Sequence, residues 1–140
     1  MKLLLENKTA VITGAARGIG KAIAKRFAEE GCNIAFTDLN EESIKATESE
    51  LLTLGVKVKG YISNAADFND VENTVKQIHQ DFGRIDVLVN NAGITRDTLM
   101  MRMSEKQWDD VITVNLKSAF NFIHAVVPIM ARQRNGSIIN

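Results

Sequence analysis

Short apolar runs rich in β-branched residues alternate along this chain with segments whose apolar residues recur at helical spacing. The strand-like runs cover residues 9–13, 33–37, 56–62, 86–89 and 137–139. No hairpin signal joins consecutive runs, and tight turns cannot connect parallel strands, so the pattern predicts parallel pairing through helical crossovers. Right-handed crossovers place helices on both faces of such a sheet. We therefore expect an α/β fold in which residues 1–140 form one Rossmann-like, doubly wound parallel sheet, truncated after its fifth strand.

Local signals mark where the helices begin and end. Asn69 with Glu72, and Ser104 with Gln107, fit the capping box, in which two side chains satisfy free amides at a helix start. Three glycines fit left-handed helix C-caps: Gly31, Gly55 and Gly83. These signals support the division of the chain into alternating strands and helices.

Composition and the scarcity of ligating side chains narrow the class of partner. Lys plus Arg and Asp plus Glu each total 17, so a formal net charge of zero gives no electrostatic reason to expect nucleic acid or an anionic membrane. Apolar stretches such as 125–131 are too short to span a bilayer, and the first residues lack the apolar core of a signal peptide. Cys32, the only cysteine, has apolar neighbours that predict a buried thiol. A single cysteine cannot form an internal disulfide, so a cytoplasmic protein is expected. His79 is expected to be solvated and His124 lacks ligands at a suitable spacing, so no metal site is expected.

Small and polar residues follow the predicted strands at the points where a ligand would bind. In a doubly wound sheet, ligands lie outside the carboxyl ends of the strands, near the switch in strand order. The first run leads into the loop 13–20, the second into Asp38, and the third into Asn64 and Ala65. The fourth leads into the sequence Asn-Asn-Ala-Gly at 90–93. Such residues suit a cofactor that lies across several strand ends.

The loop after the first run has the spacing Gly-x-x-x-Gly-x-Gly, which is longer than the general dinucleotide fingerprint. Gly14, Gly18 and Gly20 remove side chains where backbone must approach a pyrophosphate and where a helix must pack against a strand. A helix that begins near Gly18 would direct its free amides and positive dipole end at the phosphates. Turns also use glycine, but the position between an apolar strand and an amphipathic helix favours cofactor binding.

Asp38 stands at the end of the second run, where an acid can accept hydrogen bonds from the hydroxyls of the adenosine ribose. It could instead flank the start of the next helix, where acids are also favoured. In the ribose role its carboxylate would repel a 2′-phosphate and so favour NAD over NADP. Arg17 argues the other way as a possible phosphate clamp, although a solvated loop arginine is equally consistent with the sequence.

Asn115 shares one helical face with Trp108, Ile112 and Ala119, and this stripe is expected to be buried. A buried amide needs hydrogen-bond partners, either as a structural bridge or as part of a site. The pattern leaves both roles open.

With the glycine loop at 13–20, the Asn-Asn-Ala-Gly sequence and Asn115 in this order, the chain resembles the classical short-chain dehydrogenase/reductase family. The run 90–103 is similar to that of the 3-oxoacyl-(acyl-carrier-protein) reductases of fatty-acid synthesis. The resemblance covers the whole chain but only a little over half of a typical member. It implies an oxidoreductase that transfers hydride from NAD(P)H to 3-oxoacyl thioesters and yields 3-hydroxyacyl thioesters.

The resemblance also implies roles for particular residues. Arg17 would lie beside the adenosine ribose or its phosphate, Asn64 and Ala65 would contact adenine, and Asn90 and Gly93 would follow the ribose and pyrophosphate. The residues that would hold the pyrophosphate are Gly14, Gly18, Ile19 and Gly20.

Asn115 matches the family's catalytic asparagine, which holds a water in a proton relay. The complete enzymes act on substrates bound to an acidic acyl-carrier protein. Arg132 and Arg134 are candidates for docking this carrier. Family members usually form tetramers through their long helices. For this chain the resemblance therefore implies a homo-oligomer, and the neutral charge balance gives no reason to expect nucleic acid or membrane as partner.

Two features depart from the reductase pattern. Those reductases typically use NADPH, whereas Asp38 is similar to the acid of NAD-dependent members, so NAD(H) and NADP(H) both stay open. Family members also carry a serine and a Tyr-x-x-x-Lys pair after the strand at 137–140, but the only tyrosine here, Tyr61, has Ala65 four residues later. We expect the 140 residues alone to be catalytically inactive. A non-catalytic dinucleotide-binding module, a fragment completed by another chain and another NAD-dependent short-chain alcohol dehydrogenase are the alternatives.

Overall fold

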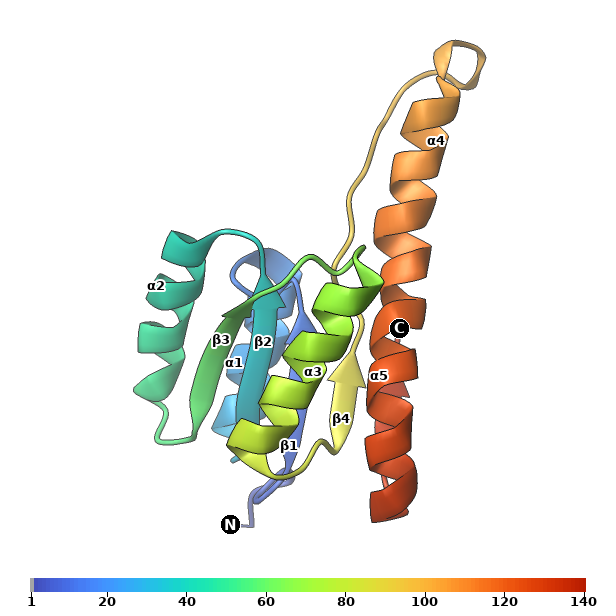
Figure 1. Cartoon of the computed structure of the whole chain (residues 1–140). Helices are drawn as coiled ribbons and strands as arrows, with labels where there is room; N and C mark the ends of the chain where they lie inside the picture. The colour runs from blue at the N-terminus through green and yellow to red at the C-terminus, as the bar shows by residue number, and fades with distance from the viewer. Residues whose placement is uncertain (1) are drawn as a thin grey trace.

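The fold is a parallel sheet with helices on both faces, as shown by the computed structural model in Figure 1, which describes residues 2–140. The strand order is β3-β2-β1-β4-β5, and every neighbouring pair is parallel. The strands are β1 (Thr9–Thr13), β2 (Asn33–Asp38), β3 (Val58–Ile62), β4 (Val87–Val89) and β5 (Ser137–Ile139). The main helices are α1 (Gly18–Glu29), α2 (Glu41–Leu52), α3 (Phe68–Phe82), α4 (Glu105–Val111) and α5 (Ser118–Gln133). The predicted α/β class and the five parallel strands are confirmed.

Alternation along the central strands divides the core into two layers. In β1, Ile12 faces α1 and α2 on one side of the sheet, whereas Val11 faces α3 and α5 on the other. In the same way Phe36 of β2 belongs to the first layer and Ala35 to the second. Each layer consists of apolar side chains buried between helices and sheet. Because all five strands are parallel, their carboxyl ends lie at the same edge of the sheet.

One predicted helix start is wrong and the other is confirmed. Helix α3 begins at Phe68, and its cap is Asp67, whose carboxylate accepts the amide of Asp70 at 2.9 Å. The predicted box of Asn69 and Glu72 therefore lies inside the helix, because an acid two residues earlier caps the first amides.

The second capping box is present as expected. Ser104 accepts the amide of Gln107 at 3.1 Å, and Gln107 accepts the amide of Ser104 at 2.9 Å. Left-handed backbone occurs at the three predicted glycines, of which Gly83 is the cap of α3, with φ 78°.

Helices α4 and α5 join through the π-helical segment η2 (Ile112–Lys117) into one helix of 29 residues. Its first half projects beyond the end of the sheet (Figure 1), so the predicted burial of the Trp108 and Asn115 stripe is wrong. Trp108 is 56% exposed because no layer lies beneath it, and the residues that face the core come from α5, such as Phe122 and Val126.

The length of this continuous helix also bears on the expectation that no apolar stretch spans a bilayer. The stretch 125–131 is only part of the helix Glu105–Gln133, which among residues 2–140 is long and apolar enough to cross a membrane. Length and composition alone do not distinguish such a helix from the core helix of a globular protein. In the fold, the α5 part of this helix packs against α3 through buried residues.

Asp86, which directly precedes β4, connects the start of β4 to the start of β1. Its Oδ2 accepts the amide of Thr9 at 2.9 Å, and Arg84 donates to both carboxylate oxygens at 2.7 and 2.6 Å. Burial opposes ionisation of this carboxyl, but the bonds from Arg84 and Thr9 outweigh burial and hold the pKa of Asp86 below its usual value. A carboxyl whose pKa is lower in the folded than in the unfolded chain stabilises the fold only while it is ionised.

We predict that Asp86→Asn lowers the free energy of unfolding at pH 7 on the order of 1–3 kcal/mol, because it removes a charge-assisted pair beside β1. The contribution of Asp86 is fully present above its unfolded pKa of about 3.9 and is lost as the pH falls through the lower folded value. Urea unfolding between pH 7 and pH 2.5 measures this, with exposed Asp109→Asn as the control. If the unmodified chain and Asp86→Asn lose the same free energy of unfolding as the pH falls across that range, the role given to Asp86 is contradicted.

Candidate functional site: a cavity at the carboxyl edge of the sheet

A cavity of about 540 Å³ lies where the sheet's first four strands end. Its walls are the end of β2, the loops that follow the strands, the start of α1 and one residue of η2. The lining residues are Gly14, Arg17, Gly18, Ile19, Thr37, Asp38, Leu39, Ser63, Asn64, Ala65, Ala66, Asn91, Ala92, Gly93, Ile94, Arg96 and Val114. Most of the site residues proposed from the sequence line this cavity. The exceptions are Gly20, Asn90 and Asn115.

The loops after β1 and β4 are joined by Thr13 and Asn91. The hydroxyl of Thr13 accepts the amides of Asn91 at 3.0 Å and Ala92 at 2.9 Å. The side-chain amide of Asn91 donates back to the carbonyls of Thr13 at 3.0 Å and Gly14 at 3.1 Å. These bonds hold two separate loops against each other at the switch in strand order. The sequence reasoning missed both roles, although a threonine that ends an apolar strand was a signal for the first.

Close backbone approach explains two of the glycines. At Gly20 a Cβ would lie 2.6 Å from the Gly14 carbonyl oxygen and 2.5 Å from the Asn91 side-chain nitrogen. At Gly14, where φ is +64°, a Cβ would lie 3.0 Å from the Cα of Ala92. Gly20 is therefore needed for the packing of α1 on the loop, and Gly14 for the contact between loops, as the sequence predicts for a helix packed closely on a strand.

The start of α1 opens onto the cavity without a side-chain cap. Arg17 occupies the N-cap position and makes no capping bond, while Gly18 and Ile19 begin the helix and line the cavity. Apart from its own chain neighbours and the backbone of α1, no described residue has an atom within 4 Å of the position that a Cβ at Gly18 would take. Helix-start amides beside open space are favourable positions for the oxygens of an anion.

Asp38 lines the cavity and also fixes the glycine loop. Its Oδ2 accepts the amide of Ala16 at 3.0 Å and its Oδ1 accepts the amide of Leu39 at 2.8 Å. The cap of α2 is Asn40, which accepts the amide of Ser43 at 2.8 Å, so Asp38 does not serve as that cap. An ionised carboxylate retains further acceptor positions after two hydrogen bonds. Asp38 can therefore hold the loop and still accept a ligand hydroxyl.

The loop after β3 forms another wall. The side-chain oxygen of Asn64 accepts the amide of Ala66 at 3.1 Å, and the carbonyl of Ala65 accepts the side-chain amide of Asn121 at 2.9 Å. Both polar atoms of the peptide group between Ala65 and Ala66 are therefore bonded within the chain. Asn121 was not singled out from the sequence, because its contact spans 56 residues.

Asn115 is a bridge between η2 and the loop after β4. Its Oδ1 accepts the amide of Ile94 at 2.7 Å and its Nδ2 donates to the carbonyl of Ile94 at 2.9 Å. A Cβ at Gly93 would lie 3.1 Å from that Oδ1. Of the two roles left open by the sequence, the geometry displays the structural bridge, although the amide is exposed rather than buried. Asn115 lies in a π-helical segment, a local geometry frequent at functional sites.

Asn90 faces the neighbouring strand rather than the cavity. Its Nδ2 donates to the side chain of Asn140 at 2.8 Å, and its buried Oδ1 has no hydrogen-bond partner within the part of the chain that the structure describes. At this edge of the sheet Asn91, not Asn90, reaches the cavity.

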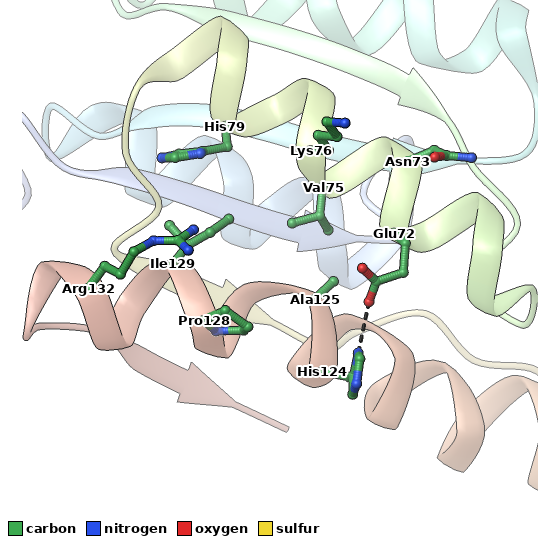
Figure 2. A pocket seen from close by; sticks show the side chains of 10 residues that line it. All are labelled: Glu72, Asn73, Val75, Lys76, His79, His124, Ala125, Pro128, Ile129 and Arg132. Atoms are coloured by element: carbon green, nitrogen blue, oxygen red, sulfur yellow. Dashed lines mark hydrogen bonds and ion pairs between the residues drawn. The ribbon is translucent and has the colours of Figure 1, made fainter.

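A second cavity, of about 350 Å³, lies between α3 and α5 and is shown in Figure 2. Nδ1 of His124 and Oε1 of Glu72 are hydrogen-bonded across it at 2.8 Å, and His79 and Arg132 lie toward its other end. The His124 ring packs against Phe68, with 5.0 Å between ring centroids. Among residues 2–140 no group of three or more His, Cys, Asp or Glu side chains is placed to hold a metal ion. This groove therefore offers packing and a side-chain hydrogen bond, whereas the first cavity has the start of α1, which no side chain caps, in its wall.

The chain belongs to the short-chain dehydrogenase family, whose model matches residues 8–140. It is 50% identical over 136 residues to the 3-oxoacyl-(acyl-carrier-protein) reductase FabG of Thermotoga maritima, a match that covers 97% of this chain and 55% of that protein. The Chlamydia muridarum FabG is 45% identical over 100% of this chain and 57% of that protein. The chain thus spans about half the length of these relatives.

A solved structure agrees with this assignment. The crystal structure of NAD⁺-bound xylitol dehydrogenase superposes with a TM-score of 0.94 at 34% identity, covering 96% of this chain and 52% of that one. Together with membership of the family, this likeness implies that the chain binds a dinucleotide.

We predict that Gly14→Val weakens dinucleotide binding about tenfold or more, equivalent to about 1.4 kcal/mol. The added side chain would press on Ala92 and shift the loop that faces the phosphates. Calorimetric titration measures the affinity. Gly55→Val is the matched control, because Gly55 also has positive φ but nothing within 4 Å and lies away from the cavity. Unchanged binding by Gly14→Val would show that the phosphates bind elsewhere.

Proposed function

We propose that this chain is the NAD(P)(H)-binding portion of an oxidoreductase that reduces 3-oxoacyl thioesters to 3-hydroxyacyl thioesters in fatty-acid synthesis. The observation that carries the proposal is the cavity at the carboxyl edge of the sheet, which has the uncapped start of α1 at one side and the loops after β2, β3 and β4 around it. The identity to reductases named FabG supports the choice of substrate class.

The residues that line the cavity fit an extended dinucleotide. The amides at Gly18 and Ile19 would bind the pyrophosphate, and Arg17 would lie beside the adenosine ribose or its phosphate. The wall formed by Asn64 and Ala65 would contact adenine.

Toward the reacting end, Gly93 would lie along the ribose, and Asn115 would position a water near the substrate carbonyl. Bound nicotinamide would supply the hydride, while the protein fixes its orientation and excludes water from the strand ends. In this structure the Asn115 amide is occupied by Ile94. A water held by Asn115 would therefore bind at the lone pair that Oδ1 retains.

The cofactor preference rests on Asp38. Two backbone amides fix its carboxylate at the cavity wall, so the charge would stand close to a ribose 2′-phosphate and repel it. We therefore favour NAD(H) over NADP(H). Arg17, exposed at the mouth of the same cavity, is the feature that favours NADP(H).

The proposed partners are further copies of the chain and an acyl-carrier protein. An apolar face of the α4–α5 helix is exposed, and a partner helix in a homo-oligomer would cover it: Trp108, Ile112, Leu116, Phe120 and Val127. Arg132 and Arg134 are exposed near β5, where an acidic carrier could dock. We propose a cytoplasmic protein with neither nucleic acid nor membrane as partner.

A dinucleotide-binding module without catalysis is the second candidate function. The hydroxyl of Tyr61, the chain's only tyrosine, donates to Asp81 at 2.7 Å, and Tyr61 does not line the cavity. Burial, together with this bond to a carboxylate, raises the pKa of Tyr61 far above its usual value. Tyr61 is therefore a poor proton donor for a carbonyl in the site. The likeness to xylitol dehydrogenase also keeps another short-chain alcohol dehydrogenase as an alternative.

We predict that the chain binds NADH more tightly than NADPH, and that Asp38→Ala narrows the gap on the order of 1–3 kcal/mol by removing a charged partner. Calorimetric titration of both cofactors measures the gap, with exposed Glu41→Ala as the control. Equal or tighter binding of NADPH by the unmodified chain would contradict the role of Asp38 as a selector.

We also predict that these 140 residues alone reduce no 3-oxoacyl thioester, because they hold no Tyr-x-x-x-Lys pair. A positioned general acid contributes about 10²–10⁴-fold to such a step. Loss of NAD(P)H absorbance at 340 nm measures turnover, before and after addition of the carboxyl-terminal half of a FabG relative. Sustained turnover without that half would show that another residue supplies the proton.

A further inference from the structure

Asn121 of α5 is a fully buried amide that supports the cavity from behind. Its side chain is 0% exposed, and its Nδ2 donates to the carbonyl of Ala65 at 2.9 Å. Ala65 lines the dinucleotide cavity, whereas Asn121 does not. Asn121 therefore acts on the cavity wall only through the backbone of the loop after β3.

The hydrogen bond to Ala65 fixes one particular peptide group. The carbonyl of Ala65 is bonded to Asn121, and the amide of the same peptide group, at Ala66, is bonded to Asn64 at 3.1 Å. The amide of Asn64 is in turn bonded to Asp70 at 2.8 Å. The orientation of the Ala65–Ala66 peptide is thus fixed by one bond to its carbonyl and one to its amide. The bond to the carbonyl comes from Asn121 of α5.

Stability alone gives little reason for an amide at this position. The Oδ1 of Asn121 is buried and has no hydrogen-bond donor among the described residues. A buried acceptor without a donor costs folding free energy, and an apolar side chain of similar size would remove that cost but leave the Ala65 carbonyl without its donor, so the two effects on stability oppose each other. The distinctive effect of the amide is the orientation of the Ala65 carbonyl.

We propose that Asn121 is a positioning residue for the adenine end of the bound dinucleotide. The inference rests on the proposed function, in which Asn64 and Ala65 form the adenine wall. With its carbonyl turned toward Asn121, the Ala65–Ala66 peptide presents a fixed surface against which a flat base can pack. The helix that carries Asn121 continues from η2, where Asn115 holds Ile94, so one helix supports both ends of the cavity.

The test separates the two halves of the cofactor. We compare the unmodified chain with Asn121→Leu, which keeps similar volume without the donor, and with Asn121→Gln, which restores an amide. NADH affinity is measured by calorimetry, and affinities for 5′-AMP and for reduced nicotinamide mononucleotide by NMR titration. Exposed Asn73→Leu on α3 is the matched control, because its side chain neither lines the cavity nor contacts the loop.

Asn121→Leu is expected to lose about tenfold in affinity for NADH and 5′-AMP, with reduced nicotinamide mononucleotide changed less than about twofold. Asn121→Gln should recover part of the loss, and the urea midpoint of Asn121→Leu should stay near that of the unmodified chain. Unchanged AMP affinity, or an equal loss for both half-cofactors, would overturn the inference. If the unmodified chain binds no dinucleotide, the proposed function fails, and the inference fails with it.

If Asn121→Leu does not fold, the unmodified chain decides the matter. The side-chain amide signals of Asn121 should shift on saturation with 5′-AMP and stay in place with reduced nicotinamide mononucleotide, although neither compound touches this residue. Absence of a shift with 5′-AMP would overturn the proposal.

Discussion

The link between Thr13 and Asn91 is the constraint on which the rest of the cavity depends. Parallel strands deliver their carboxyl ends to one edge of the sheet, but the loops that follow them would separate without a connection. Four hydrogen bonds between these two residues and the backbone of the opposite loop hold the turns after β1 and β4 together. The amide of Asn91 leaves no room for a side chain at Gly20, so α1 packs directly on the loop and its first amides open onto the cavity.

The long helix serves two surfaces with different requirements. Its inner side packs into the core through Phe122 and Val126 and fixes two cavity loops through Asn115 and Asn121. Its outer side leaves large apolar residues in solvent, among them Trp108 at 56% exposure. The element that fixes two cavity loops therefore also carries the exposed apolar residues.

Much of the fold was predictable, because apolar residues that recur every two or every 3.6 positions indicate which strands and helices pack against each other. The five strands, their parallel direction and the glycine loop follow from local patterns, and Asp38 lies at the cavity as expected. Burial of the Trp108 stripe was not predictable, because a helical pattern does not show whether a sheet lies beneath it. The cap of α3 was misplaced because Asp67 and Asn69 are both good caps, and only the backbone path distinguishes them.

The site was predictable only in part, for the same reason. Residues that follow strands reveal themselves by position, as Gly18 and Asn64 do. Residues that act through long-range hydrogen bonds, such as Asn91 and Asn121, leave no local signal, because their partners are 77 or 78 and 56 positions away. Neighbouring amides are also hard to assign. Asn90 and Asn91 differ by one position, and the direction of the backbone sends only the second to the cavity.

A crystal structure of the chain grown with NADH tests the central claim, that the cavity at the carboxyl edge of the sheet holds the dinucleotide. We expect pyrophosphate oxygens on the amides at Gly18 and Ile19, the ribose beside Asp38 and adenine against Ala65. A dinucleotide bound in the groove between α3 and α5, or density that leaves the start of α1 free, would contradict it.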